Sequence, residues 1–133
     1  MELATGTGTI LLVDDQDLVI DVGKDMLSML GYTVLIAKNG SEALEVFEQN
    51  KNTVDLVVLD YVLPGMSGAE IFDGIKSIRP DARVLISSGY SKDGEAGELL
   101  QRGCCGYIQK PFNLLELSLK IRDAFDCPQN KQA

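Results

Sequence analysis

The sequence predicts an α/β fold, with helices on both faces of an open, doubly wound sheet of five parallel strands. Three observations indicate this class. Five short apolar runs alternate with segments of helical periodicity along 133 residues. Three of these runs are nearly continuous in Val, Ile and Leu, which is typical of parallel strands buried on both faces. A composition of 45% hydrophobic and 24% charged residues suits a single globular domain.

The five apolar runs are the expected strands, because they have the length and aliphatic composition of buried strands. In chain order they are TILLV (Thr9–Val13), TVLIA (Thr33–Ala37), VDLVVL (Val54–Leu59), ARVLIS (Ala82–Ser87) and GYIQ (Gly106–Gln109).

The expected helices lie between and after these runs, where apolar residues recur three or four positions apart. One face of the first helix carries Leu18, Val22, Met26 and Met29, one face of the third carries Ile71, Ile75 and Ile78, and one face of the last carries Leu114, Leu117, Ile121 and Ala124.

Paired capping residues mark three helix starts. These pairs are Asn39 with Glu42, Ser67 with Glu70, and Asn113 with Glu116. The fourth of the five helices, near Lys92–Arg102, is expected to be the least stable, because each glycine inside a helix costs roughly 1 kcal/mol relative to alanine. It contains Gly94 and Gly97.

The domain is expected to span residues 9–126, with flexible tails at 1–8 and 127–133. The net charge of -8 argues against direct binding to nucleic acid, which requires a basic surface. The chain has no apolar run of membrane-spanning length and no signal-peptide pattern at its start.

The cysteines and the absence of histidine restrict the chemistry further. The three cysteines are odd in number, and Cys104 and Cys105 are adjacent, so we predict no disulfide framework and a reducing, cytoplasmic setting. Cys104 is expected to be a small buried residue and Cys105 a passive turn residue. Because the chain has no histidine, catalysis or metal binding by its own imidazoles is excluded.

Polar residues follow the strands at one edge of the expected sheet. Asp14 and Asp15 follow the first strand, Asp60 the third, Ser87 and Ser88 the fourth, and Lys110 the fifth. Taken singly, these residues could be helix caps or loop residues. If the strand order is 2-1-3-4-5, the first and third strands meet where the order reverses, and ligands bind at such a point.

A hard divalent cation fits this set of side chains. Three converging carboxylates repel one another, and burying them without a cation is costly. Mg²⁺ prefers a few carboxylates together with water and substrate oxygens. A carboxylate nucleophile beside Mg²⁺, a lysine and a hydroxyl has the parts required for phosphoryl transfer.

Four segments, taken in order, resemble the receiver domain of two-component response regulators. They are ILLVDDQ, LVVLDYVLPGMSG, LISSGYS and YIQKPF, and the resemblance runs from about Thr9 to Phe125. The residues of these segments are most similar to those of receivers attached to hybrid sensor histidine kinases. The resemblance implies a flavodoxin-like fold with strand order 2-1-3-4-5, the order that the general rule for these sheets gives for a chemotaxis receiver.

The resemblance also implies a role for each matching residue. Asp60 would accept a phosphoryl group from a histidine kinase, a histidine phosphotransfer domain or a small acyl phosphate. The Mg²⁺ ligands would be Asp15, Asp60, the backbone carbonyl of Val62 and, through water, Asp14. The phosphoryl-binding and switch residues would be Lys110, Ser88 and Tyr107, with a cis bond before Pro111.

Two departures and several alternatives accompany this assignment. Ser88 stands where Thr is common, Gln16 stands where Glu is frequent, and Ser87 is the alternative switch residue. An aspartate-nucleophile phosphatase would need an acid at Val62. An FMN-binding protein would need a hydroxyl-rich loop after the first strand, and a receiver-like module that is never phosphorylated would lack one of the acids or the lysine.

The family resemblance leads to two expectations about signalling. The face formed by the fourth helix, the fifth strand and the fifth helix would change with phosphorylation and can pair two copies in a homodimer. Val62 and Tyr90 would tune the rate of dephosphorylation. Because Val62 has no polar side-chain atom and Tyr90 is bulky, we expect slow self-dephosphorylation and no other enzymatic activity.

Overall fold

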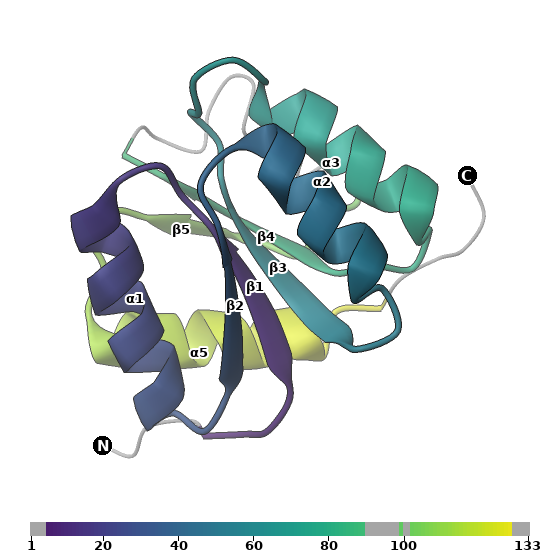
Figure 1. The fold of residues 1–133 in the computed structure, drawn as a ribbon. Coiled ribbons are helices and arrows are strands. Elements are labelled where there is room, and N and C mark those ends of the chain that lie inside the picture. Colours follow the sequence, from purple (N-terminus) through teal and green to yellow (C-terminus); the bar gives the residue numbers. More distant parts are fainter. Residues whose placement is uncertain (1–4, 90–98, 100–101, 129–133) are drawn as a thin grey trace.

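The computed structural model describes residues 5–89, 99 and 102–128 and confirms the predicted fold class. Its elements are β1 (Thr9–Val13), α1 (Asp17–Met29), β2 (Thr33–Ala37), α2 (Gly40–Gln49), β3 (Val54–Asp60), α3 (Gly68–Ile78), β4 (Val84–Ser88), β5 (Tyr107–Gln109) and α5 (Leu114–Phe125). All neighbouring strands are parallel, in the order β2-β1-β3-β4-β5 (Figure 1).

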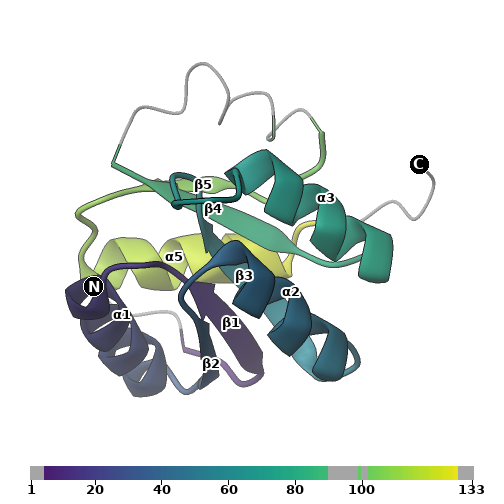
Figure 2. The same cartoon turned by 45° about the horizontal axis from the view of Figure 1, so that its top comes forward.

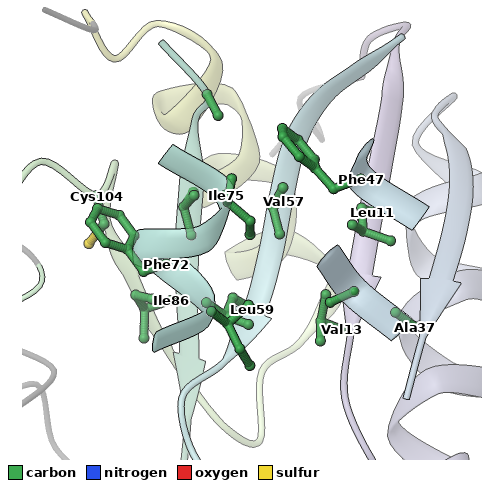
Figure 3. Close-up of a cluster of buried hydrophobic side chains, with 14 of the residues drawn as sticks. Leu11, Val13, Ala37, Phe47, Val57, Leu59, Phe72, Ile75, Ile86 and Cys104 are labelled. Atoms are coloured by element: carbon green, nitrogen blue, oxygen red, sulfur yellow. The ribbon is translucent and has the colours of Figure 1, made fainter. Parts of the chain in front are cut away.

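The sheet lies between two layers of helices, α2 and α3 on one face and α1 and α5 on the other (Figures 1 and 2). Alternate strand residues point to opposite faces, so each strand contributes to two hydrophobic clusters. Leu11, Val57 and Ile86 pack beneath α2 and α3 (Figure 3), whereas Leu12 and Leu85 pack against α1 and α5. Burial on both faces explains why the central strands are almost entirely aliphatic.

The predicted capping residues begin three helices. The Ser67 hydroxyl accepts from the backbone N–H of Glu70, whose carboxylate accepts from the N–H of Ser67, both at 3.1 Å. Asn113 and Glu116 form the same reciprocal pair. Asn39 caps α2 by accepting from the N–H of Glu42 at 2.8 Å.

The apolar face expected for α1 is only partly covered. Leu18 and Met29 are exposed, with 74% and 68% of their surfaces accessible, and Val22 is also exposed. The helix packs through Ile20, Gly23 and Leu27, and the half-buried Met26 also packs against the core. A Cβ atom at Gly23 would lie 3.0 Å from Leu12 Cδ2, so this glycine permits close contact with β1. Most of the apolar stripe seen in the sequence therefore remains on the surface.

The prediction for the cysteines is half right. Cys104 is buried and has a free thiol, as expected. Cys105, however, forms a disulfide with Cys127, and their Cα atoms lie 5.7 Å apart. The prediction failed because Cys127 is 22 residues away in sequence and is brought to Cys105 only by folding. The cysteines therefore no longer support a reducing compartment.

The remaining expectations about segments have mixed outcomes. The expected fourth helix, Lys92–Arg102, falls almost entirely outside the described residues. The backbone N–H of Gly6 donates to Leu30 O, so contacts extend beyond the expected start of the domain, whose boundaries remain predictions. Within the described residues, no helix is long and apolar enough to cross a membrane.

The packing of α1 predicts unequal costs for two leucine truncations. Leu27→Ala should lower the free energy of unfolding by about 2–5 kcal/mol, because it opens a cavity in the core. Leu18→Ala should lower it by less than about 0.5 kcal/mol, because that side chain lies on the surface. Urea denaturation measures both values, and equal losses would contradict the packing described here.

Candidate functional site

The candidate site lies at the carboxyl ends of the strands, where the strand order reverses between β1 and β3. Asp14 directly follows β1, Asp60 is the last residue of β3, and Lys110 directly follows β5. The sheet register fixes these positions, because Val13 pairs with Leu59 and Asp60 pairs with Ser87. The fold therefore brings together side chains that are up to 96 residues apart in sequence.

Lys110 links the two buried acids of the site. Its Nζ lies 2.7 Å from Asp14 Oδ2 and 3.2 Å from Asp60 Oδ2. Asp14 is only 2% exposed and Asp60 5%. Because charges buried this deeply require partners, the ammonium group is the principal balance for both carboxylates.

Backbone donors hold the other oxygen of each buried carboxylate. The N–H of Gln16 donates to Asp14 Oδ1 at 2.9 Å, and the N–H of Val62 donates to Asp60 Oδ1 at 3.2 Å. Each acid is therefore bound through one oxygen by its own loop and through the other by Lys110. This arrangement fixes the orientation of both carboxylates before any ligand binds.

The pKa values of Asp60 and Lys110 are both raised, for different reasons. Burial, together with the charge of Asp14, raises the pKa of Asp60, although Lys110 and the Val62 N–H oppose the rise. Burial would lower the pKa of Lys110, but the nearby Asp14 and Asp60 outweigh it and raise that pKa. Lys110 is therefore a cation at neutral pH, and Asp60 is an incompletely stabilised anion.

The donor set fits a divalent metal ion. Carboxylate oxygens of Asp14, Asp15 and Asp60 lie within 4.8 Å of one another. Three carboxylates against the single ammonium of Lys110 leave two negative charges unbalanced at the site. Asp15 is exposed, so its carboxylate faces the open side of the site. Oxygen ligands of this kind and number suit Mg²⁺, which retains several waters when bound.

The expected hydroxyl and aromatic residues also lie near this edge of the sheet. Ser88 is buried, and its carbonyl accepts from the N–H of Lys110 at 2.8 Å, whereas the carbonyl of Ser87 accepts from the N–H of Tyr61 at 2.9 Å. Tyr107 lies inward, and burial raises its hydroxyl pKa. Ser88 opposes that rise, but the Tyr107 hydroxyl has no partner among the described residues that meets the geometry of a hydrogen bond.

An open cavity of about 540 Å³ gives access to Asp60. Its lining includes Asp15, Gln16, Val62, Gly89 and Lys110. Val62 is 50% exposed and lies beside the acid that it helps to orient. The peptide bond between Lys110 and Pro111 is cis, as predicted. Tyr90 lies outside the described residues.

Sequence reasoning missed a second hollow beside this cavity, which is lined mainly by apolar side chains. Leu18, Val22, Pro111 and Phe112 contribute to it, and Gln16 and Lys110 line both hollows. The signal was present in the sequence, since Leu18 and Val22 were recognised as one apolar stripe. Periodicity places them on one face of the helix but does not say whether that face is covered.

Comparison with known proteins decides the family. The family described as "Response regulator receiver domain" matches residues 10–122 of this chain. The chain belongs to the receiver domain family. It is therefore a receiver domain of two-component signalling, as the resemblance of its motifs implied.

Individual receivers match over most of the chain. The sensor kinase CckA of Brucella abortus is 36% identical over 122 residues, which are 92% of this chain and 13% of that protein. The receiver domain of the hybrid histidine kinase CckA superposes with a TM-score of 0.74 at 31% identity, covering 89% of this chain and 99% of that one.

A third match bears on the metal. The response regulator TrrA of Thermotoga maritima, solved in complex with Mg²⁺ and BeF, has a TM-score of 0.78 at 33% identity. The match covers 88% of this chain and 98% of that one. The receiver spans less than half the length of several curated relatives that it matches.

The raised pKa of Asp60 predicts a pH-dependent gain in stability on its neutralisation. The folded protein holds the Asp60 proton more tightly than the unfolded chain does, so ionised Asp60 destabilises the fold above its folded pKa. In EDTA at pH 7, Asp60→Asn should raise the free energy of unfolding by roughly 0.5–2 kcal/mol. The gain should shrink as the pH falls through the folded pKa toward the unfolded value of about 3.9.

Urea denaturation of both proteins between pH 7 and pH 4 measures this difference. Asp25→Asn is the matched control, because Asp25 lies exposed on α1 and should give no such trend. A loss of stability in Asp60→Asn at pH 7 would contradict the assignment of Asp60 as an incompletely stabilised anion.

Proposed function

We propose that this receiver accepts a phosphoryl group on Asp60 from a histidine kinase or a histidine phosphotransfer domain. The observation that carries the proposal is the bridge from Lys110 to both Asp14 and Asp60 at the reversal point of the sheet. A lysine placed there can neutralise a phosphoryl group bound to Asp60. The chain lacks the acid at Val62 that a phosphatase would need and the hydroxyl-rich loop that an FMN-binding protein would need. A module that is never phosphorylated would leave the Lys110 bridge without a role.

In the proposed reaction an oxygen of the Asp60 carboxylate attacks the phosphorus of a phosphohistidine. A new O–P bond forms as the P–N bond breaks, and the electron pair of that bond returns to the imidazole nitrogen. The backbone N–H of Val62 holds the carboxylate in position, and Lys110 stabilises the negative charge on the phosphoryl oxygens.

Mg²⁺ completes this site. Asp15, Asp60 and the Val62 carbonyl would bind the ion directly, and Asp14 would bind it through water. When bound, Mg²⁺ offsets the remaining negative charge and neutralises charge on the transferred group. Beyond its own phosphorylation and slow dephosphorylation, the domain is proposed to catalyse no reaction.

The partner is proposed to dock on the apolar hollow beside the site. Leu18 and Val22 are exposed and line this hollow, and Phe112, which also lines it, lies in the same loop as Lys110. A phosphohistidine must reach Asp60 through the adjoining cavity, so the protein that bears it must cover the rim shared by the two hollows. Large apolar side chains on an exposed helix at such a rim suit a protein partner.

Phosphorylation is proposed to act on the face that contains β5 and α5. Ser88 and Lys110 would contact the phosphoryl group, and Tyr107 would move with Ser88. If two conformations of this face differ in free energy by only a few kcal/mol, phosphorylation can shift the population from one to the other. The same face can pair two copies. We place the domain in the cytoplasm, either on its own or attached to a hybrid sensor kinase, with no direct role for nucleic acid or membrane.

Phosphorylation should require both Asp60 and Mg²⁺. With acetyl phosphate and Mg²⁺, the wild-type domain should gain one phosphoryl group by intact mass, whereas Asp60→Asn or added EDTA should abolish the gain. Asp15→Asn should instead raise the Mg²⁺ concentration required, because it removes a charged ligand. If Asp60→Asn still gained a phosphoryl group, Asp60 would not be the acceptor.

The docking surface should matter for transfer from a protein but not from a small donor. Leu18→Ala should lower kcat/KM for transfer from a phosphorylated hybrid-kinase core about five- to thirtyfold, as loss of an interface anchor does. The rate with acetyl phosphate should stay unchanged. Glu45→Ala, exposed on α2 on the opposite face, is the control. Equal slowing with both donors would place Leu18 outside the docking surface.

Val62 should slow phosphoryl loss. Hydrolysis requires a water in line with the phosphorus, and the valine side chain cannot orient one. Val62→Asn should speed loss by about tenfold, which is a barrier change of roughly 1.4 kcal/mol. After acetyl phosphate is removed and Mg²⁺ is kept in the buffer, loss of the added phosphoryl mass measures the rate, and Tyr90→Glu tests the second expected position. If neither substitution speeds the loss, neither position controls the water.

A further inference from the structure

The disulfide between Cys105 and Cys127 joins the two ends of one structural unit. Cys105 lies just before β5, and Cys127 lies two residues after α5. Between them lie β5, Lys110, the loop that contains Pro111, and the whole of α5. The bridge therefore closes the segment that supplies the ammonium of the candidate site, at the end of β5 opposite to Lys110.

The two sheet faces explain why Cys105 is the cysteine that pairs. Cys104 packs with Phe72 and Leu99 in the cluster beneath α2 and α3, where burial raises the pKa of its thiol. Cys105 packs on the opposite side, in the cluster covered by α1 and α5. Because successive residues of an extended chain point to opposite faces, only Cys105 is directed toward the end of α5.

Hydrogen bonds that do not involve sulfur hold both cysteines in place. The N–H of Cys105 donates to Val84 O at 2.7 Å, and Arg83 Nε donates to Cys127 O at 3.0 Å. The N–H of Cys127 donates to Ala124 O at 3.2 Å. Both residues are also only half-buried, so a small thiol can approach them. After reduction, the two thiols would remain close enough to pair again.

We propose that Cys105 and Cys127 form a reversible thiol–disulfide couple that clamps α5 to the sheet when oxidised. The oxidant is a disulfide of the glutathione class. One cysteine thiolate attacks it, forming a mixed disulfide and releasing one glutathione thiol. The second cysteine thiolate attacks the mixed disulfide and releases the other, so two protons and two electrons leave the protein.

The clamp acts on α5, which packs on the sheet through one apolar face. The core contacts of α5 are made by Leu117, Ile121 and Ala124 along one face. Closing a loop across the whole unit restricts the unfolded chain and opposes separation of α5 from β5. The thiol redox state would thereby set how firmly the β5–α5 unit is held, independently of the phosphoryl chemistry.

The test uses the full chain equilibrated in glutathione buffers from mostly reduced to mostly oxidised. Alkylation with N-ethylmaleimide under denaturing conditions should label three cysteines at the reduced extreme and only Cys104 at the oxidised extreme. Return to reduced buffer should restore three labels. The oxidised protein should melt about 10 °C higher than the reduced protein.

Matched variants separate the clamp from other causes. Cys105→Ser and Cys127→Ser should melt at the same temperature in both buffers, whereas Cys104→Ala and Asp60→Asn should keep the shift. The proposal would be overturned if three cysteines were labelled in every glutathione buffer, because no disulfide would then form. It would also be overturned if reduction of the folded protein could not open the disulfide, or if the disulfide formed without changing the melting temperature. The wild-type labelling decides the case if a cysteine variant does not fold.

Discussion

Two carboxylates buried beside a single ammonium are the constraint on which the rest of this domain depends. Asp14 and Asp60 approach each other only because β1 and β3 are neighbours at the reversal of strand order. Lys110 reaches them only because β4 and β5 extend the same sheet in parallel. The site thus requires the complete strand order, and any rearrangement of the sheet would leave a buried charge without its partner.

The two layers of helices support the buried charges to different extents. The cluster beneath α2 and α3 contains most of the aromatic core, including Phe47 and Phe72, and supports the central strands (Figure 3). The cluster on the other face ends at Ile108 and α5, next to the segment that carries Lys110. A well-packed core on one side therefore offsets the cost of an incompletely balanced charge, while α5 covers the other face of the strand that leads to Lys110.

Much of this arrangement could be predicted from the sequence, because local signals and strand order agree. Aliphatic runs gave the strands, Ser67 and Asn113 gave helix starts, and the polar residues at strand ends gave the site. Two features could not be predicted, since each depends on which face a residue occupies. Gly23, rather than the larger Leu18, allows α1 to lie close to β1. The pairing of Cys105 with Cys127 requires the end of α5 to lie near Cys105, and no local sequence pattern predicts that proximity.

The separation of 96 residues between Asp14 and Lys110 also has a consequence for how the protein is made. On the ribosome the acids emerge first, and the ammonium emerges only with the final strand. Until then the growing chain contains an acidic pair without its counter-charge, and β5 and α5 cannot yet close over the sheet. The nascent chain can therefore collapse around β1 and β3 well before its site is complete, and it can accept a phosphoryl group only after Lys110 has emerged.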